Sequence, residues 1–333
     1  MSSPVGVVKL VDISQCPTPQ TLADAIKDAM QQQGFLFIKG HGLQAQVDQL
    51  FEISQDFFHN ESDAEKQRCS YANNRGYTKM SQETLDPSNP APDLKQGFNV
   101  GYIAPTEPPQ PSHPLPNKFG LHVDKLCRFQ LDCFAFCQRL LEAFAVILDL
   151  EPSFFTRNHK HDQNDVSILR FLHYPEVPPG KQVDPNRAGA HSDYGSLTLL
   201  FQRKNGGKGL QILPSTEPID SPDSAWQNTG LVEDALLVNI GDALELWSGA
   251  TFKSTLHRVR LPTPLPKEGI PERFSIAWFN QPAPNASLKT VVPTSSITEH
   301  DLQRMERKGV KAGTELTASQ HLEARLASTY KLS

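Results

Sequence analysis

Two histidines and an aspartate stand in segments rich in β-formers, with types and spacing suited to a metal site. His191 and Asp193 are two residues apart in "GAHSDYGSLTLLFQ", and His257 lies in "KSTLHRVRL". If the first segment is a strand, the side chains of His191 and Asp193 share a face, because strand side chains alternate. Burying them together costs free energy unless a metal, a proton relay or a hydrogen-bond network pairs with them. Two imidazoles and one carboxylate also form the ligand set of non-haem Fe(II) sites, which leave three octahedral positions open.

A further β-rich segment, "RFSIAWFN", begins with an arginine and a serine that could bind a carboxylate. Arg273 and Ser275 are two residues apart, so they share a strand face. A 2-oxo acid can take two open positions on the metal and leave the third for dioxygen, but its second carboxylate then needs an anchor. A guanidinium fork suits that carboxylate, and a serine hydroxyl adds one donor. The order of the two histidines, Asp193, Arg273 and Ser275 therefore predicts an iron site with a 2-oxo acid co-substrate.

Three other interpretations compete with this one. Zinc also accepts two histidines and an aspartate, but no further carboxylate stands out as a general base, and zinc does not explain Arg273. An oxidase could use the same three ligands without a 2-oxo acid, with Arg273 and Ser275 holding the carboxylate of the substrate itself. A binding protein with a relic site should have lost a ligand, whereas all three are present.

The surrounding elements predict a β core behind a helix-rich N-terminal half. Short runs of β-formers from residue 166 onward are separated by Gly, Pro, Asn and Asp, which is typical of an antiparallel sandwich or barrel. A long helix is expected at about 123–149, where Cys133 and Cys137 follow the helical spacing of core residues. We expect strands at 7–12 and at "FLFIKG", helices after Pro19 and at about 43–59, and irregular chain over 70–122.

Composition excludes several classes of protein. The chain has 333 residues and a net charge of −5, with no cluster of Lys and Arg, so we expect no nucleic-acid partner. No apolar run approaches the roughly 18 residues of a membrane helix, and the first residues lack the pattern of a signal peptide. We therefore expect a cytoplasmic protein with a small-molecule substrate and no membrane partner. The sequence does not indicate an oligomeric state.

The motif His-x-Asp, His, Arg-x-Ser resembles that of the Fe(II)/2-oxoglutarate-dependent oxygenases, in the branch related to isopenicillin N synthase. The resemblance covers nearly the whole chain and includes "GFLFIKGHGL", "LLVNIGDALELWSGATFKSTLHRV" and "RFSIAWFNQP". Within the branch, "ILRFLHYP" and "RAGAHSDYGSLTLLFQ" are similar to the fungal thymine 7-hydroxylase type and to fungal natural-product oxygenases. Plant members usually carry Asn in place of Leu172 and often Glu in place of Gln96, so the substrate class is open.

The resemblance implies a mainly β fold with flanking helices, a distorted double-stranded β-helix or jelly roll. Residues 1–120 would form a mixed α/β region on the core, and residues 121–333 a support helix and catalytic jelly roll, as one structural unit. The implied activity is a dioxygenase that uses Fe(II), 2-oxoglutarate and dioxygen to oxidise a C–H bond of a small cyclic or heterocyclic molecule, as in secondary metabolism or pyrimidine salvage.

The resemblance also implies roles for individual residues. His191, Asp193 and His257 would be the metal ligands and the catalytic residues. Arg273, Ser275 and Tyr174 would bind 2-oxoglutarate, and Arg170, Tyr194 and Phe279 would line the substrate pocket.

Each pocket residue also has a structural interpretation. Arg170 lies in an apolar run, so an internal salt bridge competes with substrate contact. Phe279 could be a core residue. Tyr194 follows Asp193 directly and should face away from the site, unless Gly195 permits a local twist. Asp242 in "NIGD" is expected to be a turn residue, and His173 to be structural.

Overall fold

The computed structural model describes residues 7–86, 91–203, 209–308 and 315–329. Its strands are β1 (Lys9–Asp12), β2 (Phe35–Lys39), β3 (Gly76–Thr78), β4 (Gln96–Val100), β5 (Ile103–Ala104), β6 (Gln110–Pro111), β7 (Ile168–Tyr174), β8 (Asn186–His191), β9 (Leu197–Gln202), β10 (Leu210–Ile212), β11 (Gln227–Asn228), β12 (Leu236–Ile240), β13 (His257–Arg260) and β14 (Arg273–Asn280). Its helices are α1 (Pro19–Gln32), α2 (Gln44–Asn60), α3 (Asp63–Arg68), α4 (Asn117–Gly120), α5 (Val123–Ile147), α6 (Ser153–Thr156), α7 (Asp242–Trp247), α8 (Glu299–Arg307) and α9 (Ala318–Thr329).

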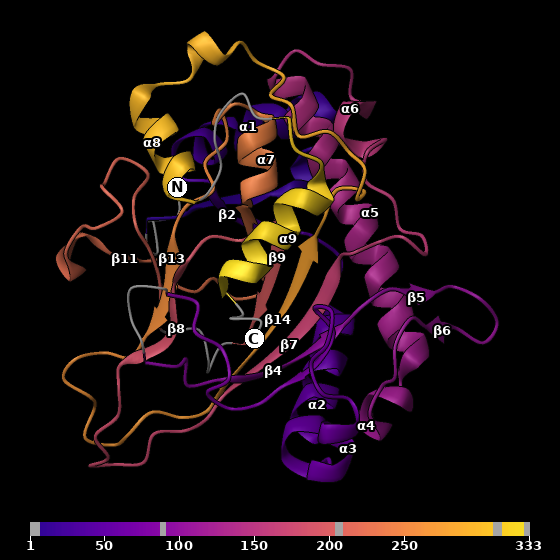
Figure 1. Ribbon diagram of the computed structural model, residues 1–333, viewed down its shortest axis with the longest axis vertical. Coiled ribbons are helices and arrows are strands. Elements are labelled where there is room, and N and C mark those ends of the chain that lie inside the picture. The colour runs from indigo at the N-terminus through magenta and orange to yellow at the C-terminus, as the bar shows by residue number, and fades with distance from the viewer. Residues whose placement is uncertain (1–6, 87–90, 204–208, 309–314, 330–333) are drawn as a thin grey trace.

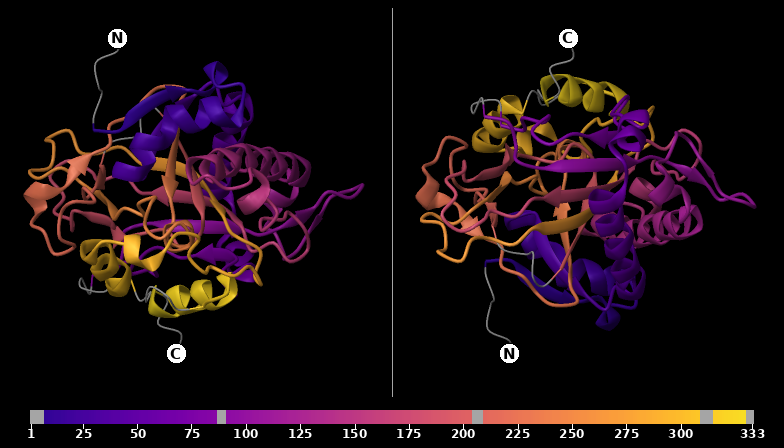
Figure 2. Two further views of the ribbon diagram at one scale, coloured as in Figure 1. Left: turned by 90° about the horizontal axis from the view of Figure 1, so that it is seen from above. Right: turned by 90° about the horizontal axis from the view of Figure 1, so that it is seen from below.

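Two sheets form the β core. The larger sheet has the strand order β1-β2-β12-β9-β14-β7-β4-β3, and the smaller one has the order β11-β10-β13-β8. Helices surround them, and Figure 2 shows the N-terminal strand and helix (indigo) and the C-terminal helices (yellow) on opposite sides of the core. The prediction of a β core with flanking helices is confirmed. The division of the chain at residue 120 remains a prediction, although β1 to β4 all belong to the larger sheet.

The long helix α5 packs beside α1 (Figure 1), and its buried face belongs to the hydrophobic core. Cys133 and Cys137 are both fully buried in this core and form no disulfide, which confirms that they are core thiols. Burial raises the pKa of both thiols, so they stay protonated at neutral pH. Helix α1 begins as expected, because Thr18 and Thr21 form a reciprocal cap and Pro19 is the first helical residue.

The prediction of irregular chain over residues 70–122 is wrong in part. Strands β3 and β4 lie inside this range and extend the larger sheet beyond β7. Their sequences, GYT and QGFNV, are short and contain Gly and Asn, which are depleted in strands. Strand β4 forms because β7 pairs with it from Gln96 to Val100. Hydrogen bonding to a distant strand has overridden weak local propensity.

In the described ranges, no helix is long and apolar enough to cross a membrane.

A buried carboxylate joins the C-terminal helices to the β core. Asp242 is 2% exposed and lies 3.2 Å from both Lys308 Nζ and Arg325 Nε. Its oxygens also accept hydrogen bonds from Ser192 and Ser254. Burial would raise the pKa of Asp242, but the charges of Lys308 and Arg325 outweigh burial and lower it. The expectation of a simple turn residue is wrong, because Asp242 begins α7 and anchors two distant segments.

Asp242→Asn should therefore destabilise the fold by about 1–3 kcal/mol, since the buried Lys308 and the partly buried Arg325 lose a charged partner while a hydrogen-bonding oxygen remains. Because the pKa of Asp242 is lowered by folding, its contribution is complete above pH of about 4 and is lost as the pH falls further. Urea denaturation at neutral and acidic pH measures both effects, and the difference between wild type and variant should shrink in acid.

Asp223→Asn is the matched control for this variant. Asp223 pairs with Arg258 and Arg260, but its side chain is 61% exposed, so its loss should cost less than about 0.5 kcal/mol. Equal destabilisation by the two substitutions at neutral pH would show that Asp242 is not the anchor of the C-terminal helices.

Candidate active site

The three predicted metal ligands meet at one end of the smaller sheet. His191 is the last residue of β8, and His257 is the first residue of β13 and pairs with it across the sheet. Asp193 lies in the loop between β8 and β9, so the expectation that it shares a strand with His191 is wrong. The loop nevertheless turns Asp193 toward the histidines, and its Oδ1 lies 3.8 Å from His257 Nε2.

Hydrogen bonds fix the orientation of all three side chains. Nδ1 of His191 lies 2.7 Å from the carbonyl oxygen of Gly189, and Nδ1 of His257 lies 3.1 Å from that of Thr255. Each Nδ1–H can donate to its carbonyl, which leaves the Nε2 lone pair available to a metal. Burial, reinforced by the neighbouring His257, lowers the pKa of His191 to about 3, so His191 is neutral.

One oxygen of the Asp193 carboxylate is held by hydrogen bonds, and the other faces the two histidines. Oδ2 accepts hydrogen bonds from Thr198 Oγ1 at 2.6 Å and from Asn239 Nδ2 at 2.7 Å. Oδ1 remains on the side of the histidines. The ligand atoms of His191, Asp193 and His257 all lie within 4.8 Å of one another. Two imidazoles and a carboxylate oxygen arranged in this way fit Fe(II) with open positions.

The expected co-substrate residues lie on two paired strands of the larger sheet. Arg273 on β14 is opposite Tyr174 on β7, and its guanidinium carbon lies 4.8 Å from the centre of the tyrosine ring. Its Nη2 donates to Gln202 Oε1 at 3.1 Å. In the described part of the chain, Nε and Nη1 of Arg273 and Oγ of Ser275 are buried without a hydrogen-bond partner.

Unpartnered buried donors are costly, so these three atoms indicate a missing acceptor. A carboxylate supplies two acceptor oxygens, which suits a guanidinium edge and a hydroxyl. The residues present therefore fit the distal carboxylate of 2-oxoglutarate as well as they fit the metal.

All nine residues predicted from the sequence line a single cavity of about 130 Å³, between the two sheets. They are His191, Asp193, His257, Arg273, Ser275, Tyr174, Arg170, Tyr194 and Phe279. Tyr194 lines the cavity because it belongs to a loop rather than a strand, so the alternation that would turn it away does not apply. A Cβ on the following Gly195 would lie 2.5 Å from the carbonyl oxygen of Asn280, so glycine is needed there for close packing. Phe279 is partly exposed, whereas the preceding Trp278 is buried in the core.

Arg170 forms the internal salt bridge that was expected as the alternative to substrate contact, and it lies at the wall of the cavity. It lines the cavity, and its Nη2 also donates to both carboxylate oxygens of Glu83, at 2.6 and 2.7 Å. Glu83 is 1% exposed and lies 3.2 Å from Lys95, which lines the cavity as well. Arg170 is thus held by a buried ion pair at the cavity wall.

Sequence reasoning missed several residues of this site. Asn239 supports Asp193, and its position within the apolar run "LLVNI" was an available signal. Leu322 and Leu326 of α9 line one side of the cavity, and Lys95, which is paired with Glu83 behind it, lines another. Nothing local in the sequence marks these four residues, because they approach the site only through the folding of distant segments.

Comparisons with known proteins agree with this geometry. A family model described as the 2OG-Fe(II) oxygenase superfamily matches residues 163–282, and one described as the N-terminal region of a non-haem dioxygenase in morphine synthesis matches residues 8–120. The UPF0676 protein C1494.01 of Schizosaccharomyces pombe is 32% identical, over 97% of this chain and 92% of that protein. The 2-oxoglutarate-dependent dioxygenase citB of Monascus ruber is 27% identical, over 93% of this chain and 89% of that protein.

Solved structures are similar over the full length of the chain. A full-length protein of Neurospora crassa in complex with alpha-KG and thymine has a TM-score of 0.75 and 28% identity, and covers 98% of each chain. The same Neurospora crassa protein in complex with alpha-KG and 5-formyluracil has a TM-score of 0.74 and 27% identity, over 99% of this chain and 100% of that one.

Proposed function

The chain belongs to the 2OG-Fe(II) oxygenase superfamily, and on this premise we propose that it oxidises a C–H bond of a small cyclic or heterocyclic molecule. It is a 2-oxoglutarate-dependent dioxygenase, an oxidoreductase that uses Fe(II), 2-oxoglutarate and dioxygen. The bound iron and its co-substrate supply the oxidising chemistry, and the protein holds the substrate close and excludes competing reactions.

In this proposal His191, Asp193 and His257 hold the iron. Their support comes from the convergence of the three ligand atoms and from the carbonyl partners that direct both Nε2 atoms into the site. Arg273 and Ser275 hold the distal carboxylate of 2-oxoglutarate, beside Tyr174. The three unpartnered buried donors of Arg273 and Ser275 are the single observation that carries the assignment of the co-substrate.

Tyr194, Phe279 and Arg170 are proposed to form the substrate pocket beside the iron. Aromatic side chains suit planar rings through offset stacking, and a few polar groups in an apolar pocket orient the ligand. The cavity of about 130 Å³ favours a compact ring over a long acyl chain or a polypeptide. Asn99 also lines the cavity, and its buried Oδ1 has no partner among the described residues, so it could accept from an N–H or O–H of the ring.

Two substrate classes fit this pocket. The likeness to the Neurospora crassa protein bound to thymine supports a pyrimidine hydroxylase. The resemblance of the sequence to fungal natural-product oxygenases supports oxidation of another ring compound as the second class. Succinate release in the presence of Fe(II) and 2-oxoglutarate distinguishes the two classes. The candidate substrates are thymine, 5-formyluracil, phenolic rings and other heterocycles. A fatty acid and a short peptide serve as controls. Stimulation by the fatty acid or the peptide alone would contradict the proposed substrate class.

Arg170→Ala should lower substrate-coupled turnover at least tenfold if Arg170 contacts the substrate, because one polar contact in an apolar pocket is worth about 1.5–3 kcal/mol. The binding of 2-oxoglutarate should change little, since Arg273 carries it. Turnover, the apparent constant for 2-oxoglutarate and the melting temperature are measured on the same preparation.

Glu83→Gln is the matched control for Arg170→Ala, because it breaks the ion pair but keeps the guanidinium at the cavity wall. The proposal predicts that Glu83→Gln loses stability with a smaller loss of turnover. Parallel losses of melting temperature and turnover in both variants would make Arg170 a structural ion-pair residue.

A further inference from the structure

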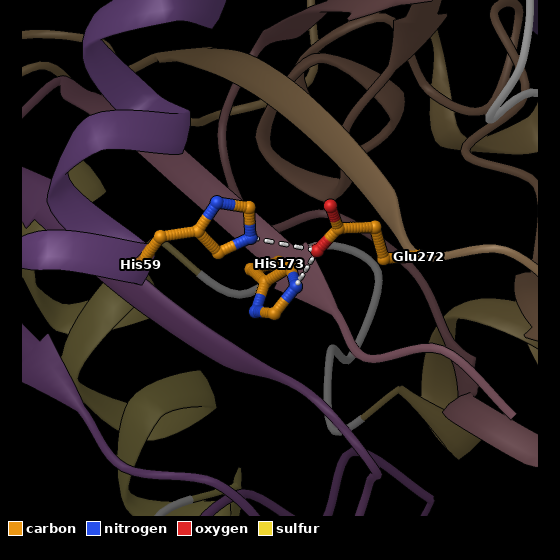
Figure 3. A group of neighbouring side chains, drawn as sticks. All are labelled: His59, His173 and Glu272. Carbon is orange, nitrogen blue, oxygen red and sulfur yellow. Dashed lines mark hydrogen bonds and ion pairs between the residues drawn. The ribbon is translucent and has the colours of Figure 1, made fainter. Parts of the chain in front are cut away.

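A second group of two histidines and one carboxylate lies outside the active site. His59 in the last turn of α2, His173 on β7 and Glu272 immediately before β14 bring their ligand atoms within 4.8 Å of one another. Figure 3 shows both imidazole rings directed at the same oxygen of Glu272, while the other carboxylate oxygen points away from them. We propose that this group, the α2 cluster, is a second metal site that binds Zn²⁺.

The distances suit a small tetrahedral metal. Nε2 of His59 and Nε2 of His173 each lie 2.9 Å from Oε2 of Glu272. In a tetrahedral zinc site with bonds of roughly 2.0–2.1 Å, neighbouring ligand atoms are roughly 3.3 Å apart. A small outward shift of the three side chains would therefore admit the ion. Three protein ligands with water in the fourth position form a common zinc coordination.

Packing holds the two rings in place before any metal binds. The ring of His173 stacks on Phe274 with centroids 4.6 Å apart, and Phe58 lies 5.5 Å from it on the helix side. The ring of His59 meets the same Phe274 edge-on at 5.6 Å. Ligands whose rotamers are fixed by neighbours lose little entropy on coordination.

The hydrogen-bond partners of His173 can support its metal-bound form. Nδ1 of His173 lies 2.8 Å from Nε2 of Gln96, and Oε1 of Gln96 accepts from the Tyr77 hydroxyl at 2.5 Å. A half-turn of the Gln96 amide would present its oxygen to Nδ1–H, and the Tyr77 hydroxyl can accept from the amide nitrogen instead. Nε2 of His173 then keeps its lone pair for the ion, as ligating histidines require.

The charges around the α2 cluster are compatible with a cation. Burial lowers the pKa of His173 despite its bond to Glu272, and the charges of His59 and Arg187 act in the same direction, so this imidazole is neutral. Burial would raise the pKa of Glu272, but hydrogen bonds from the two histidines outweigh it and lower that pKa. His59 also stands at the C-terminus of α2, where the helix dipole favours positive charge.

The α2 cluster is open to solvent and separate from the active-site cavity. The side chains of His59 and Glu272 are 45% and 35% exposed, so an ion can enter without unfolding. None of the three residues lines the cavity, but Tyr174 and Arg273 follow His173 and Glu272 directly and do. A bound ion would tie α2 to the two strands that carry these co-substrate residues.

Zinc stoichiometry tests the proposal, because the active-site triad also binds zinc and the two sites must be counted separately. After equilibrium dialysis against micromolar Zn²⁺, wild type should hold two ions per chain, and His59→Gln, Glu272→Gln and His257→Ala one each. The double variant His257→Ala/Glu272→Gln should hold none. His300→Gln, which alters an exposed histidine at the start of α8, should keep both ions.

A thermal measurement checks that the ion sits at the α2 cluster. In the His257→Ala background, Zn²⁺ should raise the melting temperature, and adding Glu272→Gln should remove that rise. Wild type holding a single zinc that His59→Gln and Glu272→Gln retain and His257→Ala loses would overturn the proposal. Two ions remaining in both Glu272→Gln and His59→Gln would also overturn it, because the second ion would then lie elsewhere.

Discussion

The His257→Ala variant should lose its iron and its turnover while keeping its fold. His257 contributes one of three proposed ligands, and the two that remain hold Fe(II) far more weakly. The ring makes one hydrogen bond, to the carbonyl of Thr255, and contacts Phe35, His191 and Asp193. Its removal takes one imidazole out of a crowded polar cluster, so it should cost little stability. We expect succinate release below detection, with circular dichroism and the urea midpoint close to those of wild type.

Iron content after gel filtration with 2-oxoglutarate present measures the first part of this prediction. His300→Ala serves as the control, since it removes an exposed imidazole that does not line the cavity and should leave iron and turnover unchanged. Adding Glu272→Gln to His257→Ala excludes iron held by the α2 cluster. Normal iron content and normal turnover in His257→Ala would contradict the assignment of His191, Asp193 and His257 as the iron ligands.

Arg273→Ala should raise the apparent constant for 2-oxoglutarate by roughly 10- to 150-fold, because a charge-assisted contact of this kind is worth about 1.5–3 kcal/mol. The metal ligands lie on β8, on β13 and in the loop after β8, whereas Arg273 lies on β14 of the larger sheet, so iron binding should be kept. Turnover at saturating 2-oxoglutarate should recover in part, since Arg273 is proposed to bind the carboxylate of 2-oxoglutarate that is remote from the metal.

Arg273→Lys and Ser275→Ala refine this test. Lysine keeps the charge but not the planar fork, so its effect should lie between those of wild type and alanine. Ser275→Ala removes a single hydroxyl donor and should raise the constant less than Arg273→Ala does. An unchanged constant in Arg273→Ala, with the constant for the substrate raised instead, would favour the oxidase interpretation, in which these residues hold the carboxylate of the substrate.

Residue types and local periodicity determined much of this protein. The cap of α1 at Thr18 and Pro19, the buried face of α5 and the apolar runs of the core strands are local signals, and the structure reproduces them. The ligand candidates were also readable, because few side chains bind iron or a carboxylate and they stand at the ends of recognisable strands. His191, Asp193, His257, Arg273 and Ser275 were readable in this way, whereas the roles of Tyr174, Arg170, Tyr194 and Phe279 came from the family resemblance. All nine line one cavity.

Tertiary structure alone decided what surrounds those residues. Arg170 pairs with Glu83, 87 residues earlier, and Thr198 and Asn239 reach Asp193 from β9 and β12. Strand β4 exists because β7 pairs with it. Such contacts depend on which distant segments become neighbours, and the free energy of burying or pairing them is absent from any local pattern.

The α2 cluster shows this limit most clearly. His59, His173 and Glu272 come from a helix end, a strand and the residue before another strand, and 213 residues separate the first from the last. In the sequence, His173 is one histidine in an apolar run, so a structural role was the natural expectation for it. Only the packing of α2 against β7 and β14 places a second imidazole and a carboxylate within reach of its Nε2, because the sheet register and the helix position together set those distances.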